Sequence, residues 1–280
     1  MSEVFDLFKI PPELSLMRYL DDNSSSHHFG VIDRKTGFKG FGGDPDILVA
    51  QTKALFELVE RTVFKTIADG ETSSGWAAHS KSEEAKESAK LELIERDAIL
   101  CSWLLRKSPK IIKKVYFKTF NQEFEILQFG SGENFFVLGV VVEISDSRML
   151  LSTCAASIQV GIVKLLVDSE RAFDLLTTPN SISDPKLLMH HNNFCDLAPA
   201  DLQWLYKDGQ GISYSELSFD FRVFKVPLWN GDVAWVVKAK SLDLQKLFYM
   251  NKLSDLNLER LKVLSGSIDI KLNESLHPIL

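Results

Sequence analysis

Hydrophobic and polar residues change their spacing several times along the chain. From Ile47 to Asp69 apolar residues recur every three to four positions, which predicts an amphipathic helix. Asp44-Pro45 precedes this stretch and suits a capping residue followed by an early helical proline. Ser82 opens a second predicted helix that ends near Arg106, with acidic residues at its positive end. A Gly/Ser-rich link, residues 70–75, separates the two helices.

The middle of the chain has a different composition and is rich in Phe, Val and Ile. It predicts three strands, at residues 114–120, 124–129 and 135–144, and then a third helix at 155–176. Two further apolar runs flank the turn Trp229-Asn230-Gly231-Asp232 and predict a hairpin of residues 222–228 and 233–240. Residues 1–43 are mixed and turn-rich, 180–215 are helical or irregular, and the last forty give no clear pattern. Helices that alternate with antiparallel-looking strands favour an α+β fold.

Composition narrows the class of protein. The 280 residues are 45% hydrophobic and 25% charged, which is typical of a globular chain. No apolar run reaches the roughly 20 residues of a membrane span, and the acidic start lacks the pattern of a secretory signal. We therefore expect a cytoplasmic protein without a membrane partner. The net charge of −6 argues against nucleic acid as a partner.

The most informative feature is a repeat shared by the first two helices. The pattern A-x-x-x-A-x-x-E-x-x-E-R occurs at residues 50–61 and again at 85–96, offset by 35 residues. On a helix the positions i, i+4, i+7 and i+11 of this pattern form a stripe, and its alanines let another helix approach closely. If the two copies pack together, four carboxylates meet: Glu57, Glu60, Glu92 and Glu95.

Carboxylates gathered in this way must protonate or recruit cations. Mg²⁺ is the natural counter-ion, because it takes oxygen ligands and shares them with phosphates. Arg61 and Arg96 would then address phosphate oxygens. The alternative is that these glutamates form ordinary solvated helix faces.

At these residues the chain resembles the YcaO family, whose members use ATP to activate peptide-backbone amides. The first motif reads Gly37-Phe38-Lys39-Gly40 and then Ala50 to Arg61. The second reads Ser74-Gly75-Trp76-Ala77-Ala78-His79 and then Glu84-Ala85 to Arg96-Asp97.

The resemblance implies an α+β fold of antiparallel and mixed sheets packed with the helices that carry the paired motifs. It implies one compact domain over residues 1–280, with ATP and Mg²⁺ elements at 37–171 and a C-terminal part at 172–280. It also implies a cofactor-binding set, and no catalytic residue is assigned. That set comprises Lys39, Glu57, Glu60, Arg61, Glu84, Glu92, Glu95, Arg96, Lys164 and Asp168, with Glu57, Glu60, Glu92, Glu95 and Asp168 as metal ligands.

Lys164 and Asp168 belong to the third motif of the family, a basic residue followed four positions later by a carboxylate. The family usually has arginine and glutamate there, and an aspartate is one methylene shorter. The alternative interpretation of this segment is an ordinary amphipathic helix. The interval between the first two motifs is also short, and the tail contains a single proline, Pro278, where azoline-forming members often have several.

The implied activity is ATP-dependent phosphorylation of a backbone amide, which leaves an azoline, a thioamide or an amidine on a ribosomally made peptide or protein. A separate substrate-recognition or sulfur-delivery protein is the expected partner, and a homodimer is a further possibility. The alternative is a non-catalytic scaffold or regulatory subunit of a peptide-modification complex. A helical binding module unrelated to ATP is a third.

The cysteines and histidines are weaker candidates for metal ligands. Three cysteines without a CxxC spacing indicate neither a disulfide framework nor a zinc site. Adjacent histidines, as at 27–28 and 190–191, do not easily face one ion. Cys154, just before the third predicted helix, is expected to be a small buried thiol.

Overall fold

The computed structural model describes residues 13–18, 25–67, 73–145, 147–177, 185–245, 256–273 and 275. The chain divides into two compact units. Unit 1 comprises Met1–Lys90 and Phe219–Lys240, and unit 2 comprises Leu91–Ser218 and Ser241–Leu280. The single domain expected over residues 1–280 stays a prediction, and each unit is described by itself.

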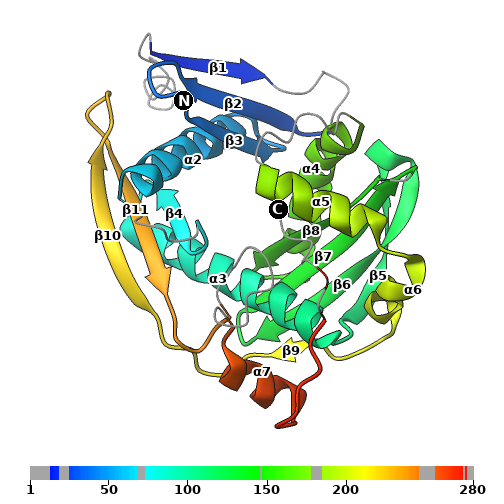
Figure 1. Ribbon diagram of the computed structural model, residues 1–280. Coiled ribbons are helices and arrows are strands. Elements are labelled where there is room, and N and C mark those ends of the chain that lie inside the picture. Colours follow the sequence, from blue (N-terminus) through cyan, green and yellow to red (C-terminus); the bar gives the residue numbers. More distant parts are fainter. Residues whose placement is uncertain are drawn as a thin grey trace. The chain divides into compact units, whose positions relative to one another are not determined.

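Unit 1 contains two three-stranded antiparallel sheets (Figure 1). The first has the order β1-β2-β3, and its strands are β1 (Leu14–Arg18), β2 (His27–Asp33) and β3 (Lys39–Asp44). The second has the order β10-β11-β4, with β4 (Trp76–His79), β10 (Asp220–Pro227) and β11 (Val233–Lys240). The second sheet therefore joins strands that lie far apart in the sequence.

Helix α2 (Ile47–Ile67) packs against both sheets of unit 1. Ala50, Ala54 and Leu58 form a core with Phe29 and Val31 of β2. Other α2 side chains, Phe56 and Val59, form a second core with Trp76, Leu228, Ala234 and Val236. The helix thus buries two faces, which explains why apolar residues occupy so many of its positions.

Unit 2 is built on one larger sheet, in which β9 is the only parallel strand among the described residues. Its antiparallel strands are β5 (Lys110–Phe117), β6 (Gln122–Gly132), β7 (Phe135–Ile144) and β8 (Ser147–Ala155). The short β9 (Ile212–Ser213) pairs with β6. Helix α4 (Ile158–Thr177) packs on β7 and β8, and its Ile162 and Leu165 enter a core with Leu138 and Val140.

The remaining elements are mostly helical. They are α3 (Ser82–Leu105), α5 (Pro185–Asp196), α6 (Pro199–Leu202) and α7 (Leu258–Ser265), with the 3₁₀ turns η1 (Lys118–Phe120) and η3 (Gln203–Tyr206). Trp103 on α3 makes edge-to-face contacts with Phe194 of α5 and with Trp204. The boundary between the units falls inside α3, so that Glu84 belongs to unit 1 and Glu92 to unit 2.

The α+β class is confirmed, as are the three long helices and the hairpin of β10 and β11. The strand predicted at 114–120 is wrong at its end, because β5 ends at Phe117 and η1 follows. Asn121 closes that turn in the left-handed region, with a φ of 51°. Strands β1 to β4 and β8 were not predicted. Residues 70–72 of the predicted link and Pro278 of the tail lie outside the described residues.

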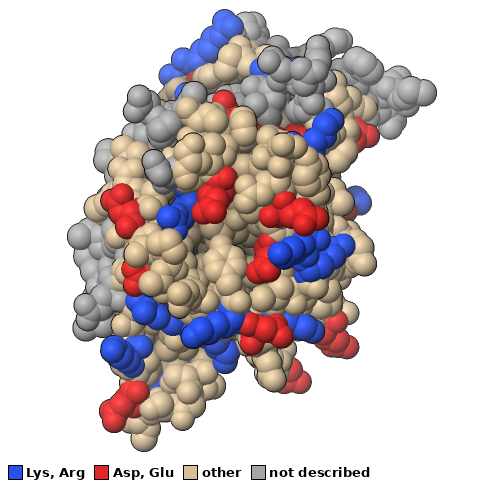
Figure 2. Space-filling model, turned by 90° about the vertical axis from the view of Figure 1, so that its right-hand side faces the viewer, with Lys and Arg blue, Asp and Glu red and all other residues tan. Residues whose placement is uncertain are grey.

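The surface shows no strong segregation of charge on the face in Figure 2. Lysine, arginine and acidic side chains are interspersed there among uncharged residues. Within the described ranges, no helix has both the length and the apolar composition needed to span a membrane.

Candidate functional site

The first copy of the repeat lies on α2, where its alanines face a strand and not a helix. A Cβ built on Gly40 would overlap the carbonyl oxygen of Ala54, and one on Gly42 would overlap that of Ala50. The expected role of the alanine stripe was helix–helix contact. In unit 1, Ala50 and Ala54 instead allow the glycines of β3 to lie directly on the helix.

This close approach places the backbone of β3 beside Glu57. The amide of Phe41 donates to Glu57 Oε2 at 2.7 Å. Glu57 Oε1 forms an ion pair with Arg61 one turn later, and the Arg61 guanidinium lies 5.9 Å from the centroid of the Phe41 ring. Glu57 is therefore held on both sides, by a strand amide and by its own helix.

Glu60 and Lys39 belong to the same part of unit 1. Glu60 is half-buried on α2, whereas Lys39, the first residue of β3, is exposed. Arg61 is also exposed, but it pairs with Glu57. To bind Mg²⁺ with its paired oxygen, Glu57 would have to exchange Arg61 for the metal.

Glu84 lies in the first turn of α3, also in unit 1. It contacts His79 Nδ1 at 2.6 Å and Lys81 Nζ at 2.8 Å. The hydrogen bond from Lys81 lowers the pKa of Glu84, so that this carboxylate is ionised at neutral pH. The His79 ring in turn stacks on Phe56 of α2, with centroids 5.8 Å apart.

In unit 2, Glu95 of the second copy is held by strand β8. Ser152 Oγ donates to Glu95 Oε1 at 2.7 Å, and the amide of Cys154 donates to Oε2 at 3.0 Å. Both donors are uncharged, so neither neutralises the carboxylate. Each oxygen keeps lone-pair capacity for a further ligand.

Glu92 and Arg96 lie within one turn of Glu95 on α3. Glu92 Oε1 is 3.8 Å from Arg96 Nε, which is an ion-pair separation and too long for a hydrogen bond. Arg96 Nε is buried, and within the described ranges it has no hydrogen-bond partner. A buried guanidinium N–H of this kind is suited to an oxygen of an anionic ligand.

The third predicted element, α4, brings Lys164 to the residue that also holds Glu95, Cys154. Lys164 Nζ donates to the carbonyl oxygen of Cys154 at 3.3 Å, while the amide of Cys154 donates to Glu95. Two of the predicted residues, from helices 69 positions apart in the sequence, therefore meet at the end of β8. Asp168 is exposed one turn further along α4.

The donor set of unit 2 fits a hard cation with phosphate. Glu92 and Glu95 supply carboxylate oxygens, the ligands that Mg²⁺ prefers, and Arg96 and Lys164 supply cations for phosphate oxygens. Across the described parts of the chain, however, no three His, Cys, Asp or Glu side chains are grouped as a metal cage. This is compatible with Mg²⁺, which is usually bound through one or two carboxylates, waters and substrate phosphates.

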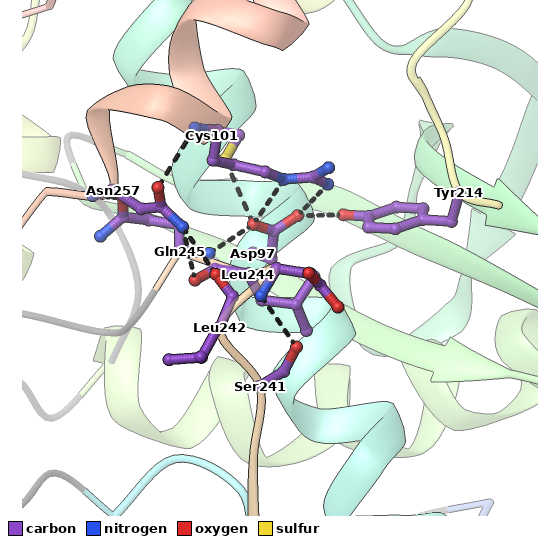
Figure 3. A network of polar contacts seen from close by, with 10 residues as sticks. Asp97, Cys101, Tyr214, Ser241, Leu242, Leu244, Gln245 and Asn257 are labelled. Carbon is purple, nitrogen blue, oxygen red and sulfur yellow. Dashed lines mark hydrogen bonds and ion pairs between the residues drawn. The ribbon is translucent and has the colours of Figure 1, made fainter. Parts of the chain in front are cut away.

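Sequence reasoning missed two kinds of residue. Ser152 supports Glu95 but lies on a strand that the pattern did not predict. Asp97, the last residue of the second motif, received no role there; it is completely buried and accepts hydrogen bonds from Arg260 and from Tyr214, the latter seen in Figure 3. Asp97 could have been noticed as a carboxylate at a position of α3 that faces the core.

The other candidate ligands form no metal site in the described residues. Cys154 is 4% exposed, as expected of a small buried thiol. Cys195 Sγ lies 3.7 Å from His191 Nε2 on α5, and burial lowers the pKa of His191.

Comparison with known proteins finds one matching family model. The model of a family described as YcaO cyclodehydratase, ATP- and Mg²⁺-binding, matches residues 67–129, which include Glu84, Glu92, Glu95 and Arg96. No curated protein sequence matches the chain.

Solved structures share the fold at low sequence identity. YcaO from Methanopyrus kandleri bound with AMPPCP and Mg²⁺ aligns with a TM-score of 0.57 and 14% identity, over 81% of this chain and 84% of that one. A chain of the E. coli microcin synthetase McbBCD complex aligns with a TM-score of 0.56 and 12% identity, over 82% and 88% of the two chains. A heterocyclase in complex with substrate and cofactor aligns with a TM-score of 0.64 and 12% identity, over 95% of this chain and 55% of that one.

The fold and the matched segment define an α+β protein with YcaO architecture. Residues 67–129 match the YcaO family model, and the chain shares the fold of solved YcaO structures.

Proposed function

We propose that the protein binds ATP with Mg²⁺ and activates a backbone amide of a peptide or protein substrate. The observation that carries this proposal is the arrangement around Cys154. Its amide donates to Glu95 and its carbonyl accepts from Lys164, so that an anionic metal ligand and a cation for phosphate are held by one residue. The family match includes Glu95, and a related solved structure is described as bound with AMPPCP and Mg²⁺.

Bound ATP and Mg²⁺ would supply the phosphoryl group that turns the amide oxygen into a leaving group. The protein's own residues bind and orient, as in other phosphoryl transfers. Glu92 and Glu95 hold the metal, Ser152 keeps the Glu95 carboxylate in one orientation, and Arg96 and Lys164 bind phosphate oxygens.

Unit 1 carries proposed ligands of its own. Glu57 and Glu60 on α2 are further metal ligands, and Glu84 on α3 is a further nucleotide ligand. Lys39 and Arg61 address the nucleotide. Asp168 is the metal ligand proposed on α4.

The product class follows from the nucleophile that adds to the amide carbon. A neighbouring Cys, Ser or Thr side chain leads to an azoline, sulfide to a thioamide and an amine to an amidine, with release of phosphate in each case. Two solved structures of similar fold are the E. coli microcin synthetase McbBCD complex and a heterocyclase in complex with substrate and cofactor. We propose a separate recognition or sulfur-delivery protein as partner here, and a homodimer in the cytoplasm as the form of the chain.

Binding of the nucleotide is tested by isothermal titration of Mg²⁺-AMPPNP into the wild type and Glu95→Gln. Removing a metal ligand should weaken binding by about tenfold or more. Glu87→Gln is the matched control, because Glu87 lies on the same helix, is exposed and pairs with Lys90. An unchanged affinity in Glu95→Gln, or a wild type that binds no nucleotide, would overturn the proposal.

A non-catalytic scaffold is the second candidate, and Asp168 favours it. This residue is exposed and is shorter than the glutamate usual at that place in the family. Phosphate release in the presence of a peptide containing Cys, Ser or Thr separates the two functions. An enzyme releases phosphate faster when the peptide is added, whereas a scaffold binds Mg²⁺-AMPPNP without peptide-stimulated turnover.

A further inference from the structure

Asp97 is the most densely bonded buried carboxylate among the described residues of unit 2. Figure 3 shows its two oxygens at the centre of a network that joins α3, α7 and two connecting segments. The donors are Arg260 Nη2 at 2.7 Å and Nε at 3.2 Å, Tyr214 Oη at 2.6 Å, the amide of Gln245 at 2.6 Å and Cys101 Sγ at 3.4 Å. Asp97 has no exposed surface, and the Arg260 side chain is 14% exposed.

The network is organised around Arg260. Its fork reaches both oxygens of Asp97, and such a bidentate pair fixes orientation as well as distance. Arg260 is itself held, because its amide donates to the Asn257 side chain at the start of α7, at 3.2 Å. The amide of Asn257 donates to Gln245 Oε1 at 2.7 Å, which closes the network.

The geometry of α3 connects this network to the proposed metal ligands. Successive residues of a helix are about 100° apart, so that Glu95 and Asp97 project about 200° apart on opposite sides of α3. Ser152 and Cys154 hold the helix on the Glu95 side. Arg260 and Tyr214 hold it on the Asp97 side. Two anchors on opposite sides prevent the helix from rotating about its axis.

We propose that Asp97 and Arg260 are positioning residues of the nucleotide site. Their ion pair fixes the rotation of α3 and thereby aims the Glu92 and Glu95 carboxylates at the metal. The C-terminal segment that carries Arg260 is in this way part of the binding machinery, although it lies 163 residues from Asp97 in the sequence. This inference rests on the proposed function of the same site.

The test compares Arg260→Gln and Arg260→Lys with a control variant of the full chain. Arg260→Gln removes the charge, whereas Arg260→Lys keeps it but loses the fork. Val142→Ala is the control, because Val142 is completely buried in the core formed with α4 and donates no side-chain hydrogen bond to Asp97. Melting temperatures identify a working temperature at which all the variants are folded, and Mg²⁺-AMPPNP affinity is then titrated.

The expected result is a loss of affinity of about tenfold or more in Arg260→Gln, since supporting residues of metal ligands have effects of this size. The affinity of Arg260→Lys should lie between those of Arg260→Gln and the wild type, and the affinity of Val142→Ala should equal that of the wild type. In the double variant with Glu95→Gln, the two losses should not add, because Arg260 acts through the metal ligands.

Two results overturn the inference while the proposed function stands. They are a wild-type affinity in Arg260→Gln, and additive losses in the double variant. A wild type that binds no Mg²⁺-AMPPNP overturns the proposed function and the inference with it. If Arg260→Gln does not fold, Tyr214→Phe replaces it, since that variant removes one donor to Asp97 and keeps the ring.

Discussion

Gly42 on β3 lies directly on Ala50 of α2, with no space for a Cβ between them. A methyl group at residue 42 would overlap the carbonyl oxygen of Ala50 and the amide nitrogen of Ala54, which are backbone atoms and cannot turn aside. Gly42→Ala should therefore lower the free energy of unfolding by about 3 kcal/mol, at the upper end of the usual range for overpacking. Urea denaturation measures this change.

Gly37→Ala is the control for this prediction. Gly37 has a φ of +75°, but a Cβ there would meet nothing within 4 Å. Gly37→Ala should therefore lower the free energy of unfolding by about 1 kcal/mol, because only the left-handed backbone conformation disfavours alanine there. If the two variants are equally stable, the contact between β3 and α2 is looser than the structure indicates.

Ser152→Ala should weaken Mg²⁺-AMPPNP binding more than it weakens the fold. The hydroxyl of Ser152 orients Glu95, and one lost hydrogen bond costs only about 1 kcal/mol of stability. We expect the affinity to fall by about tenfold, as for other partners of metal ligands. Thr177→Val removes a hydroxyl that donates within α4 and should leave the affinity unchanged. Equal losses in both variants would argue against a role for Ser152.

The stability of the protein should decrease below neutral pH through His191. Burial lowers the pKa of His191 below its ordinary value of 6.5, so the unfolded chain binds a proton more readily than the folded one. The contribution of His191 is thus present above pH 6.5 and is lost as the pH falls through the folded pKa. Melting temperatures at pH 7.5 and 5.5 should differ more in the wild type than in His191→Gln. An equal difference in both would exclude His191 as the cause.

The three cysteines should differ in reactivity toward a thiol reagent in the folded protein. Cys101 has no exposed surface, and its burial raises its pKa well above 9.0, so it stays protonated. Cys154 is buried as well, while Cys195 is half-buried. Cys195 should therefore react first, and the other two only on unfolding. Mass spectrometry after brief labelling identifies the modified residue.

Local pattern was sufficient for much of this fold. The period of α2, the acidic first turn of α3 and the apolar runs of β6 and β7 each report which face a segment buries. Strands without such a run were missed. Lys39–Asp44 contains three glycines, because β3 must lie against a helix, and nothing in its polarity indicates a strand.

For the candidate site, the sequence determined the residue types and their spacing along the helices. The repeat predicts Glu57, Glu92 and Glu95 as ligands, because side chains at helical spacing lie on one side of a helix. It could not identify what holds each carboxylate, since a partner far along the chain leaves no trace in local periodicity.

Tertiary structure alone decided those partners. It paired Glu57 with the amide of Phe41, Glu95 with Ser152 on β8, and Asp97 with Arg260 on α7. The alanines of the first copy pack against a strand, whereas the sequence predicted that they would pack against a helix. The physical reason is the same in each case. A side chain's face on a helix depends on nearby residues, whereas the group that meets it depends on the path of the whole chain.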